Sequence, residues 1–133
     1  MNPEDIKRNL EMCTGTSQWY RHFGGKAFFT DGIKSLAEMA KCWWLIDDIA
    51  LYQTHVKVRK CPAQFWTLKV NLEEKTAVLE MREDSGMPVV IKKEYEYTDF
   101  PYDKQRVWVM MDALNDKNGK PGQVPVLLLP SEY

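Results

Sequence analysis

The sequence predicts an α+β domain in which N-terminal helices pack on one face of a mainly antiparallel sheet of about five strands. Two observations predict this class. Apolar residues recur at helical spacing up to about residue 56, and from about residue 64 they alternate with polar residues. The length of 133 residues and the hydrophobic fraction of 44% suit one domain with its own core, spanning residues 1–133.

Three helices are expected in the N-terminal part, over about 1–56. Asn2 can cap the first helix, and Pro3 suits its first position. The second helix is expected over about 31–41, where apolar residues lie at i, i+3, i+4 and i+7: Ile33, Leu36, Ala37 and Ala40. The third is expected over about 43–55 and should be the most buried, because apolar residues occupy most of its circumference.

The sheet is expected over about 64–130. Apolar and polar residues alternate over 66–70, 77–81 and 89–97, and the short turns between these segments predict an antiparallel meander. Before residue 55, only the short apolar step at 27–29 suggests extended chain.

Two more strands are expected near the end of the chain. Residues 106–112 are apolar with little alternation, which favours a central strand covered on both faces. A polar loop over 115–123 follows and contains Asn118-Gly119, a strong turn signal. The last strand is expected over 126–129, bounded by Pro125 and Pro130.

Composition and charge exclude several classes of protein. The 18 basic and 19 acidic residues give a net charge of −1, which argues against a general nucleic-acid binder. The first 20 residues lack the apolar run of a secretory signal, and no apolar run is longer than that over 42–46, which is too short to span a membrane. Three cysteines without a C-x-x-C pair suit free thiols. We therefore expect a cytoplasmic protein that does not bind a membrane.

The aromatic content, with five Trp, six Tyr and five Phe, is the most unusual feature. It includes one local cluster that also carries a cation and a titratable ring: Trp19, Tyr20, Arg21, His22 and Phe23. Such a cluster suits a loop that packs the first helix against the sheet. It equally suits a binding hot spot, where Trp, Tyr and Arg are enriched.

The same cluster permits an enzymatic hypothesis. His22 would be the acid–base group, Arg21 would bind an anion, and Asp31 or Asp47 would orient the histidine. Asp47 and Asp48 point about 100° apart on the expected third helix, so one of them could meet Arg21 or His22. Otherwise both aspartates would simply lie on the solvent-exposed side of this helix. The sequence contains no catalytic or phosphate-binding motif and no metal-ligand spacing, so we expect no metal and no cofactor.

Eight segments, in this order, resemble one family. They are Thr14-Gly15-Thr16, Trp19-Tyr20-Arg21-His22, Thr30-Asp31-Gly32, Leu36-Ala37-Glu38, Trp44-Leu45-Ile46-Asp47, Phe65-Trp66-Thr67-Leu68, Tyr97-Thr98-Asp99-Phe100-Pro101 and the C-terminal residues 126–133. The family consists of small bacterial proteins, partly carried on plasmids and phages, and is classified only as a domain of unknown function. The resemblance implies a bacterial cytosolic protein and supplies no activity.

Our leading functional prediction is a non-enzymatic module that binds a protein partner, or a second copy of itself. It would bind through the exposed aromatic residues over 19–23 or through an edge strand. The enzyme built on His22 is the alternative. A weaker alternative is nucleic-acid binding through the short basic run of Lys57, Arg59 and Lys60.

Overall fold

A computed structural model describes residues 2–13, 19–24, 27–115 and 121–133. The helices are α1 (Pro3–Glu11), α2 (Asp31–Met39) and α3 (Trp43–Tyr52), with a final 3₁₀ turn η1 (Pro130–Glu132). The strands are β1 (Trp19–Arg21), β2 (Phe28–Thr30), β3 (Ala63–Asn71), β4 (Thr76–Arg82), β5 (Val89–Tyr95), β6 (Lys104–Asn115) and β7 (Pro121–Leu128). The α+β class is confirmed.

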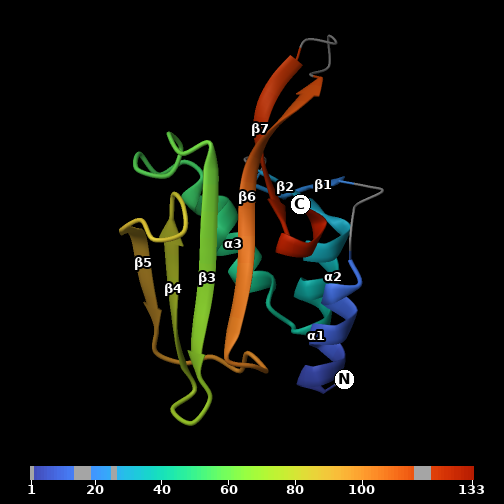
Figure 1. Ribbon diagram of the computed structural model, residues 1–133, viewed down its shortest axis with the longest axis vertical. Helices are drawn as coiled ribbons and strands as arrows, with labels where there is room; N and C mark the ends of the chain where they lie inside the picture. The colour runs from blue at the N-terminus through green and yellow to red at the C-terminus, as the bar shows by residue number, and fades with distance from the viewer. Residues whose placement is uncertain (1, 14–18, 25–26, 116–120) are drawn as a thin grey trace.

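The strands form one mixed sheet of seven, in the order β1-β2-β7-β6-β3-β4-β5 (Figure 1). All neighbouring pairs are antiparallel except β2 and β7, which are parallel. The expectation of about five antiparallel strands was therefore too low. It did not count β1 and β2, which have three residues each, although the step at 27–29 had indicated extended chain. Strand β2 pairs with β7, and β1 pairs with β2.

The central strand and the meander are as expected, with some different boundaries. Strand β6 is the fourth of seven, and β5 ends at Tyr95 rather than residue 97. The expected polar loop is shorter, because β6 extends to Asn115 and β7 begins at Pro121; its Asn118-Gly119 turn lies outside the described residues. Pro125 lies within β7, not before it. Because β2 pairs only with Val126 and Leu127, the missing N–H of Pro125 costs no pairing on that side.

The helices begin where the sequence predicts and end slightly earlier. Asn2 Oδ1 accepts a hydrogen bond from the Asp5 N–H at 2.9 Å, and Thr30 Oγ1 accepts one from the Ile33 N–H at 3.3 Å. Helix α2 ends at Met39, and α3 ends at Tyr52 instead of residue 55. The Thr14-Gly15-Thr16 segment lies outside the described residues.

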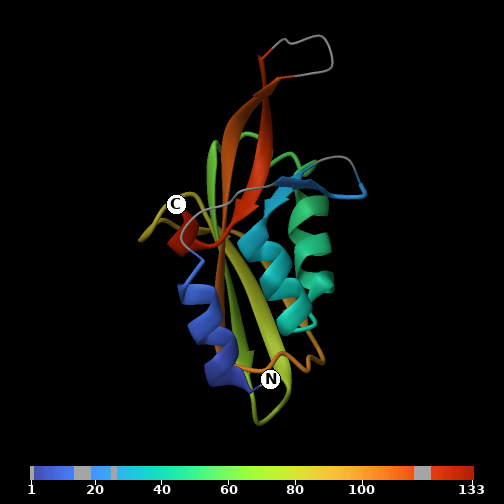
Figure 2. The ribbon, with the colours of Figure 1, turned by 90° about the vertical axis from the view of Figure 1, so that its right-hand side faces the viewer.

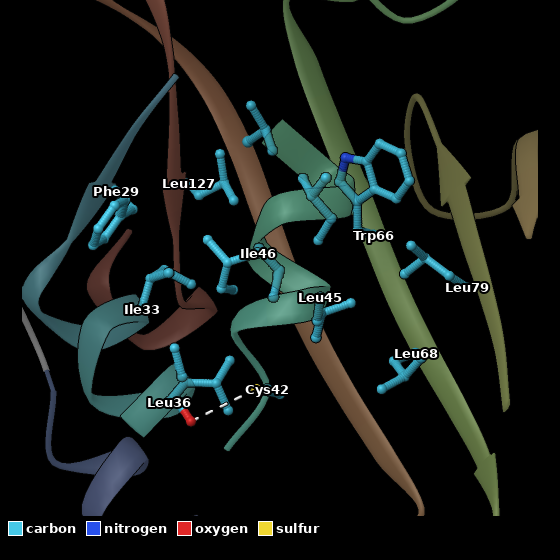
Figure 3. Close-up of a cluster of buried hydrophobic side chains, with 14 of the residues drawn as sticks. Phe29, Ile33, Leu36, Cys42, Leu45, Ile46, Trp66, Leu68, Leu79 and Leu127 are labelled. Carbon is cyan, nitrogen blue, oxygen red and sulfur yellow. Dashed lines mark hydrogen bonds between the residues drawn. The ribbon is translucent and has the colours of Figure 1, made fainter. Parts of the chain in front are cut away.

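Helices α2 and α3 share one face of the sheet with the apolar core. Figure 1 shows α3 behind the sheet, and Figure 2 shows α2 and α3 together on one side of it, with α1 to their left. In Figure 3 the side chains of α2 and α3 meet those of the sheet, including Leu45, Ile46, Trp66 and Leu68, all at most 1% exposed. No described helix covers the opposite face of β3, β4 and β5, which we call the open face. Strand β6 is central as expected; its helix face is buried, and on its other face the Trp108 ring contacts that of Tyr133, directly after η1.

Cys42 lies in this core and is expected to make the stability of the protein sensitive to alkali. The side chain is fully buried, its Sγ lies 3.7 Å from the Leu36 carbonyl oxygen, and burial raises the pKa of its thiol to about 12 (Figure 3). Above the ordinary thiol pKa of 9.0, the unfolded chain therefore loses a proton that the folded chain keeps.

We expect the free energy of unfolding to fall as pH rises from about 9 to about 12, and Cys42→Ala to reduce this slope. Urea unfolding at a series of pH values would measure both. Burial also raises the pKa of Tyr95 and of Tyr102, so a weaker slope should remain in the variant. Identical slopes for the two proteins would contradict the prediction.

Candidate functional site

The cluster at 19–23 forms edge strand β1 and the two residues after it. Successive side chains in a strand point to opposite faces. Trp19 and Arg21 therefore share the open face, while Tyr20 and His22 point to the helix face. Phe23 is 82% exposed and His22 is 3% exposed. The segment is thus not a loop, and Arg21 and His22 do not point into a common site.

His22 connects the end of β1 to α3. Its Nε2 lies 2.8 Å from Asp47 Oδ1, and its Nδ1 accepts a hydrogen bond from the Gly24 N–H at 3.1 Å. Because Nδ1 accepts, Nε2 carries the proton and donates it to Asp47. Both ring nitrogens are therefore engaged: Nε2 holds the end of β1 against α3, and Nδ1 binds the main chain two residues further on. The expected meeting of one α3 aspartate with His22 is found.

Asp48 makes the corresponding connection at the other edge of the sheet. Its Oδ2 accepts hydrogen bonds from the Tyr95 hydroxyl at 2.6 Å and from Lys93 Nζ at 3.1 Å, both on β5. Since β1 and β5 are the two edge strands, adjacent carboxylates that diverge by about 100° tie α3 to opposite ends of the sheet. The expectation that these acids only mark the solvent side of α3 is therefore wrong.

Asp31 contributes to a second group of contacts, around Tyr20. The Tyr20 ring stacks on Phe29 with a centroid separation of 5.4 Å, and Lys34 Nζ lies 4.8 Å from the Tyr20 centroid. A hydrogen bond with Asp31 raises the pKa of the Tyr20 hydroxyl. Of the four candidate catalytic residues, the structure therefore brings together only His22 and Asp47.

The C-terminal residues join three parts of the fold in a way that the sequence did not reveal. The Glu132 carboxylate accepts hydrogen bonds from Thr30 Oγ1 at 2.6 Å, the Leu129 N–H at 2.9 Å and the Gly32 N–H at 3.2 Å. Ser131 Oγ donates to the Leu10 carbonyl oxygen at 3.2 Å. The Thr30-Asp31-Gly32 motif and the C-terminal motif, about 100 residues apart, are thus one structural unit. The sequence indicated this link only indirectly, because both motifs are among the segments that resemble the family.

The open face carries a groove that the sequence analysis also missed. The groove has a volume of about 640 Å³ and lies over β3, β4 and β6. Two aromatic rings and four cations line it: Phe65, Trp108, Lys69, Arg82, Lys104 and Arg106. In the sequence, these cations occupy the polar positions of the alternating strands. They did not indicate a binding site, because charged residues normally occupy the solvent side of a sheet.

Comparison with known proteins gives a match to a family model. A family model described as "Family of unknown function (DUF6876)" matches residues 4–133, and no curated protein and no solved structure gives a significant match. The predicted resemblance to a domain of unknown function is therefore confirmed. Among the helices of the described residues, none is long and apolar enough to cross a membrane.

Proposed function

The chain belongs to the DUF6876 family, and we propose that it is a non-enzymatic interaction module that binds a protein partner at the β1 edge of its sheet. The observation that carries this proposal is an aromatic and cationic surface at a firmly held edge strand: Arg21 and Phe23 are exposed, and Trp19 is half-buried. From the family resemblance we further propose that the protein acts in the bacterial cytoplasm and is linked to mobile elements.

Strand β1 has the features of a strand-addition site. One of its sides pairs with β2, and its other side is an edge of the sheet, where a partner strand can bind the main chain. Phe23, directly after β1, projects an 82% exposed ring. Arg and large aromatic residues are the side chains most enriched in binding hot spots.

The contacts of His22 support this proposal by fixing the hairpin in place. The His22–Asp47 hydrogen bond holds the end of β1, and the His22 ring lies 4.3 Å from the Phe23 ring, centroid to centroid. A surface ordered before binding loses less conformational entropy when the partner arrives. The buried histidine therefore makes the exposed phenylalanine a better anchor.

The enzyme alternative has one observation in its favour. His22 and Asp47 are paired at 2.8 Å, as a base and its orienting carboxylate would be. The second ring nitrogen of His22, which would act on the substrate, instead accepts the Gly24 N–H. Arg21 is exposed on the other face of the strand. The geometry therefore supports the interaction module better.

We expect Arg21→Glu and Phe23→Ser to abolish retention of a protein partner that the wild-type chain retains from its native host. Cross-linking in cells followed by quantitative mass spectrometry would measure retention. Val56→Ser is the matched control, because Val56 is a 60% exposed apolar residue in the connector after α3. If the partner is a second copy, the two variants should instead lose self-association in sedimentation. The proposal would be contradicted if the wild-type chain retained no protein, or if both variants retained the same proteins as the wild type.

A further inference from the structure

We infer that the groove on the open face is a second binding surface, and that it takes a single-stranded nucleic acid. This inference is independent of the β1 edge. It is carried by two aromatic rings on neighbouring strands that lie beside an excess of cations in the middle of the sheet.

The aromatic rings of the groove lie directly opposite each other on neighbouring strands. Phe65 of β3 pairs with Trp108 of β6, and their ring centroids are 5.2 Å apart at 77°. Tyr133 extends the row, with its ring 5.5 Å from that of Trp108. Phe65 and Trp108 are half-buried and Tyr133 is 80% exposed, so ring surface is open to a ligand. Aromatic rings of this kind stack on the bases of single strands.

The cations of the groove exceed its carboxylates. Glu80 lies close to two of the cations, at 2.7 Å from Lys69 Nζ and 3.6 Å from Arg82 Nη1, and the Lys69 contact lowers the pKa of Glu80. Within the described part of the chain, Lys104 and Arg106 have no carboxylate partner. Even with Glu80 and Asp84 counted, the groove has two more positive than negative charges.

This local excess of positive charge is compatible with the balanced total charge of the chain. A net charge of −1 argues against a protein that attracts phosphate over its whole surface. The negative charges, however, include Asp31, Asp47 and Asp48 on the helix face, while the groove is positive. A balanced total therefore leaves room for one polyanion site. The site differs from the basic run of Lys57, Arg59 and Lys60 that the sequence suggested.

The position of the groove favours a single strand over an acidic peptide. Strand β3 pairs with β4 and β6, and β6 pairs with β3 and β7, so neither strand offers an edge to an added peptide strand. The ligand must be held by side chains alone, through ring stacking and contacts to anions. Bases and phosphates of a single strand supply both, whereas a duplex hides the faces of its bases.

The test measures binding of a fluorescein-labelled oligothymidylate of about ten nucleotides by anisotropy. We expect binding that weakens with salt, with a slope of about −0.7 in log K against log salt for each phosphate contact. Trp108→Ala should weaken binding about tenfold without changing the slope. Arg106→Gln should reduce the magnitude of the slope by about 0.7.

The matched control for Arg106→Gln is Arg59→Gln, which removes an exposed cation from the connector and should leave binding unchanged. If Trp108→Ala fails to fold, Tyr133→Ser removes an exposed ring of the same row without touching the core and should also weaken binding. Phe23→Ser should bind the oligonucleotide normally, which separates this inference from the proposed protein interaction. The inference would be overturned if a duplex or polyglutamate competed as well as the single strand, or if only Arg59→Gln weakened oligonucleotide binding. The absence of binding at about 50 mM salt would also overturn it.

Discussion

Replacing Glu132 by alanine is expected to lower the free energy of unfolding by about 3 kcal/mol, although Glu132 is the second-last residue of the sequence. Its carboxylate accepts three hydrogen bonds, from Thr30 Oγ1 and from the Gly32 and Leu129 N–H groups. Thr30 and Gly32 are buried at the start of α2, so their donors would be left without this acceptor. Hydrogen bonds to charged groups contribute more than neutral ones. Urea unfolding would measure the loss.

The matched control is Glu38→Ala, which removes an exposed carboxylate from α2 and should lower the free energy of unfolding by less than about 0.5 kcal/mol. Gly32→Ala provides a second check. A Cβ at position 32 would lie 2.6 Å from Glu132 Cδ, so the carboxylate would have to move away from its donors. The Gly32→Ala change should therefore destabilise the wild-type chain and have little effect in a Glu132→Ala background. A Glu132→Ala variant as stable as the wild type would contradict this account.

The parts of the fold that could be predicted from sequence are those determined by local pattern. The cap at Asn2, the amphipathic face of α2 and the alternation in β3 and β4 each depend on neighbouring residues, and the structure confirms them. Strands β1 and β2 depend on contacts far along the chain. Phe28 pairs with Val126, and three-residue strands are too short to show a period.

The candidate site shows the same limit. The cluster at 19–23 was identified from composition, but its division between two faces follows from strand geometry that the local sequence did not indicate. The groove was missed because its members lie on three strands, and each strand alone shows only an ordinary polar side. What brings Phe65 beside Trp108 is the pairing of β3 with β6, which joins segments about 40 residues apart.

His22→Ala is expected to lower the free energy of unfolding by about 2 to 3 kcal/mol and to weaken partner binding at β1. The change removes a buried ring, the acceptor of the Gly24 N–H and the donor to Asp47. Because the His22–Asp47 hydrogen bond joins the end of β1 directly to α3, the loss of stability should be concentrated at this hairpin. Urea unfolding would measure the stability. Hydrogen exchange should show faster exchange at the amide of position 22, which donates to the Ala27 carbonyl oxygen.

Asp47→Asn is the matched control, because its side-chain oxygen can still accept the proton on His22 Nε2; we expect it to cost less than about 1 kcal/mol. The comparison separates a positioning role from direct contact. His22 is 3% exposed and cannot touch a partner, whereas Arg21 and Phe23 are exposed. If His22→Ala weakens partner binding and Asp47→Asn does not, the hydrogen bond acts by holding the hairpin, and the binding surface is the exposed side of β1. Unchanged partner binding in His22→Ala, with faster exchange confirmed, would show that the partner does not need an ordered β1.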